Sequence, residues 1–132
     1  MASGANIRLI IKHPTIDPGE ITSVLGVRPD VCWSRGEAKI TDRGEKFGVR
    51  KYSMWSLSVP VLSHEDLSSK ISSIITIIRP HHEWVSRICS ECGQFLLTVD
   101  LPGANNIGAV ISVESLKCLS DMGISLGFEV FP

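Results

Sequence analysis

The stretch VCWSRGEAK, residues 31–39, brings an aromatic ring and charges of both signs close together. If these residues form a strand, Trp33, Arg35 and Glu37 lie on one face of it, because alternate residues of a strand share a face. An arginine beside a tryptophan can stack on the ring, or hold a carboxylate or phosphate through two parallel hydrogen bonds. The alternative is structural: Trp33 packs at the edge of the core, and Arg35 pairs with Glu37 or with a neighbouring strand.

Basic residues are concentrated around this stretch. Between residues 28 and 51, seven lysines and arginines stand against four aspartates and glutamates, whereas the formal net charge of the whole chain is −1. Such local polarity can orient a charged partner, although a solvated loop has the same composition. A binding surface in this region would include Trp33, Arg35, Glu37, Lys39, Arg50 and Tyr52.

The spacing Cys89-Ser-Glu-Cys92 is typical of half a zinc site. Zinc needs four ligands, which usually come from two such pairs, and only one pair occurs here. His81 or His82 lies one to two helical turns upstream and could complete a set with Cys89 and Cys92. The apolar stripe of the predicted helix includes Cys92, however, and a buried free cysteine is common. We therefore expect no metal or other cofactor, with His81, Cys89 and Cys92 as the alternative metal-binding set.

Motifs for catalysis are not found in the sequence. His64, Glu65 and Asp66 suggest acid–base chemistry, but acidic residues at a helix start are explained by the helix dipole alone. No nucleophile elbow, phosphate-binding glycine loop or dinucleotide fingerprint occurs, and residues 103–108 are predicted to form a turn. An enzyme is therefore the third alternative for function.

Composition and length indicate one soluble domain over residues 1–132. Hydrophobic residues make up 43% of the 132 residues and charged residues 20%, a balance typical of globular proteins. The first residues lack a basic leader followed by an apolar run, and no stretch approaches the roughly 20 apolar residues of a membrane-spanning helix. We expect a cytoplasmic protein whose four cysteines are reduced thiols.

Hydrophobic periodicity predicts the elements that position these residues. Alternating apolar residues predict strands at residues 7–12, 31–37, 50–59, 94–101 and 124–130, and a less regular one at 107–112. Capping residues and helical spacing predict helices at residues 18–25, from a Ser63 cap to Ile78, from His81 to Cys92, and from a Ser112 or Ser115 cap to Met122. Residues 38–49 contain two glycines and several charges and are predicted to form a mobile loop.

The order of these elements predicts an α+β fold. Strong alternation in the strands favours a mainly antiparallel sheet with one face in water. The helices would cover the other face, which gives a two-layer sandwich. The plan is similar to a ferredoxin-like βαββαβ unit with an added strand and helix. The uncovered face near the second and third strands would then be free to meet a partner.

Four segments of the chain resemble a known family: EITSVLGVRPD, WSRGE, KYSMWSLSV and ISVESLKCLSDMGISLGFEVF. They are similar, in this order, to the LG-x-x-P helix exit, the W-x-x-G-[DE] strand end, the WSL strand and the terminal SPELL…LG-x-x-L-x-x-D-[IV]-[YF] unit of a bacterial family, domain of unknown function 4279. Val113 stands where that family usually has proline, and Glu129 where it has aspartate. The resemblance spans nearly the whole chain and implies a shared fold. It implies no chemistry, because the family has none assigned.

We expect a non-enzymatic binding module that presents its second and third strands and residues 38–49 to another protein. By analogy alone, one version is a bacterial immunity or accessory protein that blocks a toxin. The alternative is a regulatory domain that senses a small anion beside Arg35. Nucleic acid and membranes are not expected partners, because Tyr52 and Phe131 are too few aromatics for a nucleic-acid-binding sheet and the net charge is near zero. A homodimer that forms through the open sheet face or through an edge strand is compatible with the predicted fold.

Overall fold

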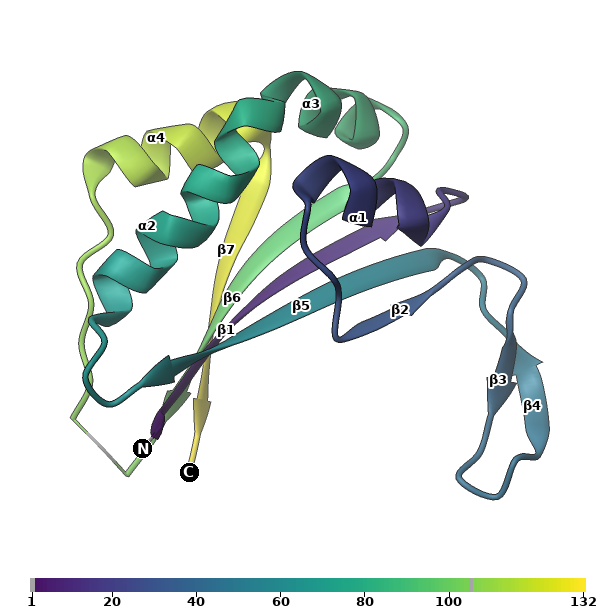
Figure 1. The fold of residues 1–132 in the computed structure, drawn as a ribbon, viewed down its shortest axis with the longest axis horizontal. Helices are drawn as coiled ribbons and strands as arrows, with labels where there is room; N and C mark the ends of the chain where they lie inside the picture. Colours follow the sequence, from purple (N-terminus) through teal and green to yellow (C-terminus); the bar gives the residue numbers. More distant parts are fainter. Residues whose placement is uncertain (1, 105) are drawn as a thin grey trace.

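Five strands form one mixed sheet in the order β2-β5-β1-β6-β7 (Figure 1). The computed structural model describes residues 2–104 and 106–132. The strands of the sheet are β1 Ala2–His13, β2 Val31–Trp33, β5 Ser53–Leu62, β6 Gln94–Pro102 and β7 Ile124–Phe131. Neighbouring strands are antiparallel except β6 and β7, which are parallel. The strand order puts β2 and β7 at the two edges of the sheet.

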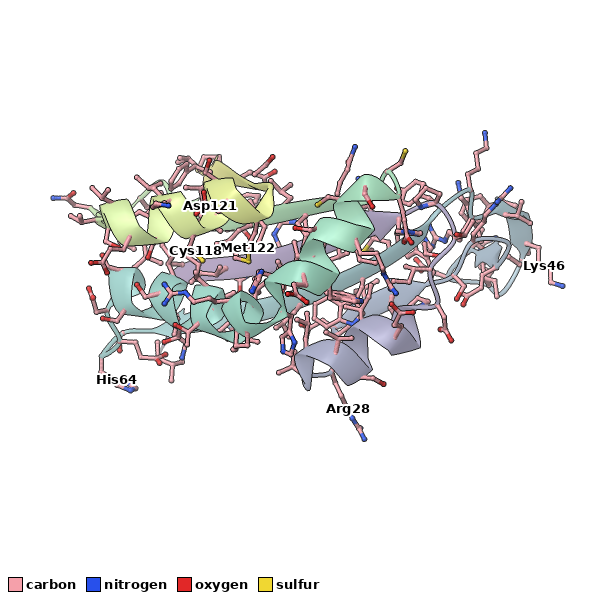
Figure 2. All side chains as sticks on the ribbon, turned by 90° about the horizontal axis from the view of Figure 1, so that it is seen from above. Arg28, Lys46, His64, Cys118, Asp121 and Met122 are labelled. Carbon is pink, nitrogen blue, oxygen red and sulfur yellow. The ribbon has the colours of Figure 1, made fainter. Side chains whose placement is uncertain are left out.

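The helices all pack on one face of this sheet, which makes the protein an α+β two-layer sandwich (Figures 1 and 2). They are α1 Pro18–Leu25, α2 Leu67–Ile78, the 3₁₀ turn η1 Arg79–His81, α3 His82–Ser90 and α4 Val113–Met122. None of the helices in the described part of the chain is long and apolar enough to cross a membrane.

Local sequence signals explain where three helices begin. The Asp17 side chain accepts a hydrogen bond from the Gly19 amide at the start of α1, where Pro18 suits the first position. Ser112 caps α4 in the same way. At α2 the cap is Asp66, three residues after the predicted Ser63, because the Asp66 carboxylate accepts from the Ser69 amide.

The inner sheet face and the apolar stripes of the helices form the core. Registered pairs such as Ile11 and Trp55 place large side chains opposite one another on this face. Trp55 is fully buried, and its indole N–H donates to the Thr22 hydroxyl of α1 at 3.0 Å. The α2 stripe contributes Leu67, Ile71, Ile74, Ile75 and Ile78. The helix layer is thereby fixed to a single side of the sheet.

Three predictions about strands are wrong. The strand predicted at residues 31–37 ends at Trp33, because Gly36 turns the chain with a φ of 91°. Residues 38–49 are not a loop but a hairpin of β3 Ala38–Ile40 and β4 Lys46–Val49. It lies below the sheet, on the side away from the helices (Figure 1).

Residues 107–112 contain no strand, which corrects the third prediction. Apolar residues do alternate in this segment, but they alternate for a reason other than strand pairing. Ile107 and Ile111 face an apolar hollow over β6 and β7, so they pack against the sheet instead of pairing along its edge. The Val110 amide donates instead to the Ser68 hydroxyl of α2 at 2.8 Å.

Candidate functional site

One end of the uncovered sheet face carries basic side chains around two aromatic rings. The strand register places Lys12 and Trp33 there: Trp33 of β2 lies opposite Met54 of β5, and Met54 lies opposite Lys12 of β1. These positions alternate with the buried Trp55 and Ile11, so they point away from the helices. We call the following set the basic–aromatic cluster: Lys12, Trp33, Lys39, Arg50, Lys51 and Tyr52.

The two rings of the cluster are held in place by their neighbours. The Trp33 indole N–H donates to the backbone oxygen of Tyr52 at 3.0 Å, and the ring centroids lie 6.2 Å apart at an interplanar angle of 53°. The guanidinium carbon of Arg50 lies 3.8 Å from the centroid of the Trp33 ring. On the other side, Lys12 Nζ lies 5.4 Å from the centroid of Tyr52. Both contacts have cation–π geometry.

Backbone hydrogen bonds fix Arg50 beside Trp33. The Gly36 amide donates to the Arg50 carbonyl at 2.8 Å, and the Arg50 amide donates to the Glu37 carbonyl at 2.7 Å. The Arg35 amide donates to the Ser53 hydroxyl at 3.0 Å. These bonds continue the β2–β5 pairing, with irregular geometry, to the base of the β3–β4 hairpin. The backbone around Arg50 is therefore held by hydrogen bonds on both sides of the hairpin base.

The positive charge of the cluster is not neutralised within the described residues. No carboxylate there lies within 4.0 Å of a cationic nitrogen of Lys12, Lys39, Arg50 or Lys51. At the other end of the same face, Arg8 binds Asp100 at 2.8 Å and Glu129 at 3.0 Å. The hydrogen bond that Arg8 donates to the Asp100 carboxylate raises the pKa of Arg8. The uncovered face is therefore basic near the hairpin and charge-paired at its far end.

Two hollows adjoin the cluster, one on each side of Tyr52. The smaller, of about 90 Å³, lies among Trp33, Lys39, Arg50, Lys51 and Tyr52. The larger, of about 420 Å³, has Lys12, His13, Pro14, Lys51, Tyr52, Cys92 and Gln94 around it. Arginine and lysine N–H groups beside a small hollow suit an oxyanion such as a carboxylate.

Of the residues that the sequence suggested for binding, the structure brings four together: Trp33, Lys39, Arg50 and Tyr52. Arg35 and Glu37 do not line either hollow, and no ion pair joins them to each other or to another described residue. The expectation that they share a face with Trp33 fails because β2 ends at Trp33. Lys12 and Lys51 belong to the cluster although the sequence did not suggest them for binding. The outward position of Lys12 in an alternating strand was the available signal.

The alternative metal set of His81, Cys89 and Cys92 is not assembled. Within residues 2–104 and 106–132, no three histidine, cysteine or acidic side chains are grouped so that they could hold a metal ion. Cys89, not Cys92, packs against the core, and burial raises the pKa of its thiol. Cys92 lies beyond the end of α3 with a φ of 68° and is exposed.

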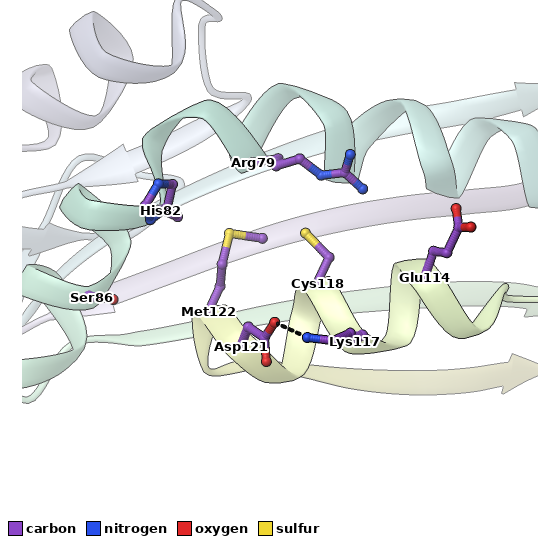
Figure 3. Close-up of a pocket in the computed structure, with 8 residues that line it drawn as sticks. All are labelled: Arg79, His82, Ser86, Glu114, Lys117, Cys118, Asp121 and Met122. Carbon is purple, nitrogen blue, oxygen red and sulfur yellow. Dashed lines mark hydrogen bonds and ion pairs between the residues drawn. The ribbon is translucent and has the colours of Figure 1, made fainter.

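A further hollow, which the sequence did not suggest, lies in the helix layer. It has a volume of about 400 Å³ and separates η1 and α3 from α4 (Figure 3). Its lining residues are Arg79, His82, Ser86, Glu114, Lys117, Cys118, Asp121 and Met122. We call this hollow the α4 groove. Its walls come from segments that are distant in the sequence, so local sequence patterns cannot predict the groove.

Comparison with known proteins places the chain in a family. Residues 4–131 match the family described as "Domain of unknown function (DUF4279)". No curated protein and no solved structure matches the chain. The matched range extends from β1 to β7 and includes the whole basic–aromatic cluster and the α4 groove. The chain therefore belongs to the DUF4279 family.

Proposed function

We propose that this protein is a non-enzymatic binding module whose basic–aromatic cluster binds an acidic segment of a partner protein. The observation that carries the proposal is the set of four cations around two fixed rings, none paired with a carboxylate in the described chain. Carboxylates on a partner would supply the missing counter-charges through charge-assisted hydrogen bonds. The charge-paired far end of the face would orient such a partner toward the hairpin.

The hydrogen bonding of His13 favours binding over catalysis. His13 lines the larger hollow and is the imidazole nearest in sequence to Lys12. Its Nδ1 accepts from the amides of Thr15 at 3.0 Å and Ile16 at 2.8 Å, so the proton resides on Nε2, which donates to Glu91 at 2.9 Å. Nδ1 is thus engaged in holding the β1–α1 connection, and Nε2 is engaged by Glu91 at the end of α3. Neither is free to act as a general base.

Sheet order and helix placement favour a finer description of the fold. The strand order β2-β5-β1-β6, with α1 between β1 and β2 and with α2 and α3 between β5 and β6, supports a ferredoxin-like βαββαβ unit. The β3–β4 hairpin is then an insertion, and α4 and β7 are additions. A cytoplasmic immunity or accessory protein of a bacterial toxin system is one version of this function, by analogy alone.

Binding of a fluorescein-labelled hexaglutamate peptide tests the proposal. The double substitution R50Q/K51Q removes two charges from the cluster, and we expect it to weaken binding by about tenfold, or roughly 1.4 kcal/mol. The matched control R43Q/K46Q removes two charges from the exposed hairpin tip and is expected to change the affinity by less than about twofold. An equal loss in both variants, or no binding to the wild-type protein, would contradict the proposal.

The hollow of about 90 Å³ favours a second candidate function, the sensing of a small anion. The anion would lie beside Arg50, not Arg35, because Arg35 does not line the hollow. Inorganic phosphate is the probe. A ligand at 100 times its dissociation constant stabilises the folded state by about 2.7 kcal/mol, which thermal unfolding detects. Stabilisation by phosphate that R50Q abolishes, without hexaglutamate binding, would select this candidate over the first.

A further inference from the structure

The α4 groove lies on the helix side of the sheet, opposite the basic–aromatic cluster. One wall is formed by η1 and the start of α3, with Arg79 and His82, and the other by α4 (Figure 3). Its volume of about 400 Å³ is within the range of small-molecule sites, roughly 300–1,000 Å³. The α4 groove shares no lining residue with the basic–aromatic cluster.

Two opposite charges in the groove have no partner in the described chain. Lys117 and Asp121 neutralise each other along α4, with 3.1 Å between Nζ and Oδ2. Arg79 and Glu114, in contrast, take part in no ion pair with a described residue. Arg79 extends from the η1 wall, and Glu114 points up from α4 (Figure 3). Among the described residues, the groove therefore offers one free cation and one free carboxylate on facing walls.

Next to these charges, toward His82, the groove is lined by sulfur (Figure 3). The Cys118 thiol and the Met122 thioether point from α4 into the space between the helices (Figure 3). Met122 is 4% exposed and Cys118 half-buried, so both are anchored in the helix layer. Methionine is polarizable and adapts its shape to apolar groups. This part of the lining suits an aliphatic group.

We infer that the α4 groove binds a small zwitterion with an aliphatic side chain, the chemistry shared by a free amino acid and a short peptide. Its carboxylate pairs with Arg79, its ammonium group pairs with Glu114, and its side chain contacts Cys118 and Met122. A simple anion would leave Glu114 unpaired, and a simple cation would leave Arg79 unpaired. A zwitterion satisfies both charges and leaves the net charge of the groove unchanged.

The probes are L-leucine and L-leucyl-L-leucine, which separate a free amino acid from a dipeptide. Titration is followed by amide chemical shifts and by calorimetry with the full chain. We expect at least one probe to bind with shifts confined to η1, the start of α3 and α4. Leucinamide, which lacks the carboxylate, and 4-methylpentanoate, which lacks the ammonium group, are each expected to bind at least about tenfold more weakly.

The variants R79Q and E114Q test the two charged contacts separately. Each is expected to weaken binding of the zwitterion by about tenfold. The matched controls R43Q and E45Q change the same residue types at exposed hairpin positions and are expected to leave it unchanged. The inference is overturned if neither probe shifts groove amides at millimolar concentration, or if binding is indifferent to R79Q and E114Q. Retained hexaglutamate binding in both variants would show that the cluster is unaffected.

Discussion

Trp33 and Arg50 show how two half-buried side chains become a defined surface. The indole N–H of Trp33 is fixed to the Tyr52 carbonyl, so the ring presents a constant plane, 3.8 Å from the guanidinium carbon of Arg50. A stacked guanidinium keeps its N–H edge available for a carboxylate, which lysine cannot reproduce. Arg35, only two residues after Trp33, has no such support from a ring. Stacking on Trp33, and not proximity in sequence, therefore distinguishes Arg50 from Arg35 as the arginine of the proposed binding surface.

The cysteine thiols differ from one another in burial. Burial raises the pKa of Cys89, whereas Cys32 and Cys92 are exposed. Because the thiolate is the reactive form, we expect a thiol reagent at neutral pH to modify Cys32 and Cys92 first and Cys89 more slowly. Mass mapping over time measures the order. Raising the pH should increase the rate at which Cys89 is modified. Modification of Cys89 as fast as that of Cys32 would contradict the burial of Cys89.

The apolar stripe of α2 provides the clearest stability prediction for an element. Ile75 is 1% exposed and Ile77, on the same helix, is 37% exposed. We expect Ile75→Ala to lower the free energy of unfolding by about 2–5 kcal/mol, because it removes buried methyl groups and leaves a cavity. Ile77→Ala is the control and should cost less than about 1 kcal/mol. Urea unfolding measures both, and similar losses would contradict the packing of α2 described above.

Contacts between helices give a prediction about pH. Glu20 of α1 accepts hydrogen bonds from the Trp84 indole at 3.0 Å and from Arg87, both of α3. The Trp84 bond first, and then Arg87, lower the pKa of Glu20 below its ordinary value of 4.5. The stabilisation is therefore present above pH 4.5 and is lost as the pH falls through the lowered value.

The variant Glu20→Gln tests this link. Because Glu20 is largely exposed, we expect the substitution to cost less than about 1 kcal/mol of unfolding free energy near neutral pH. The difference between wild type and variant should shrink as the pH drops below 4.5, where the wild-type carboxylate becomes protonated. Urea unfolding across this range measures it. A difference that stays constant into strong acid would show that the glutamate charge is not its source.

At the scale of the whole molecule, local signals predicted the architecture well. Alternation and caps such as Asp17 and Ser112 depend on neighbouring residues, so the α+β class, the helix layer and the outward face were predictable from the sequence. The hairpin within residues 38–49 was not, because its glycines and charges are equally typical of a loop. The addition of Lys12 to the cluster and the α4 groove depend on register and packing between distant segments, which periodicity does not encode.

The position of β7 has a practical consequence for all of these measurements. In the described chain β7 pairs with β6 alone, so its other side leaves backbone amides and carbonyls open over a strand of eight residues. Phe128, Val130 and Phe131 are each more than half exposed along it, at 56%, 66% and 52%. Such a border is a template for further strands. We expect concentrated samples of the protein to aggregate through this edge. Light scattering at the concentration used for each titration measures this.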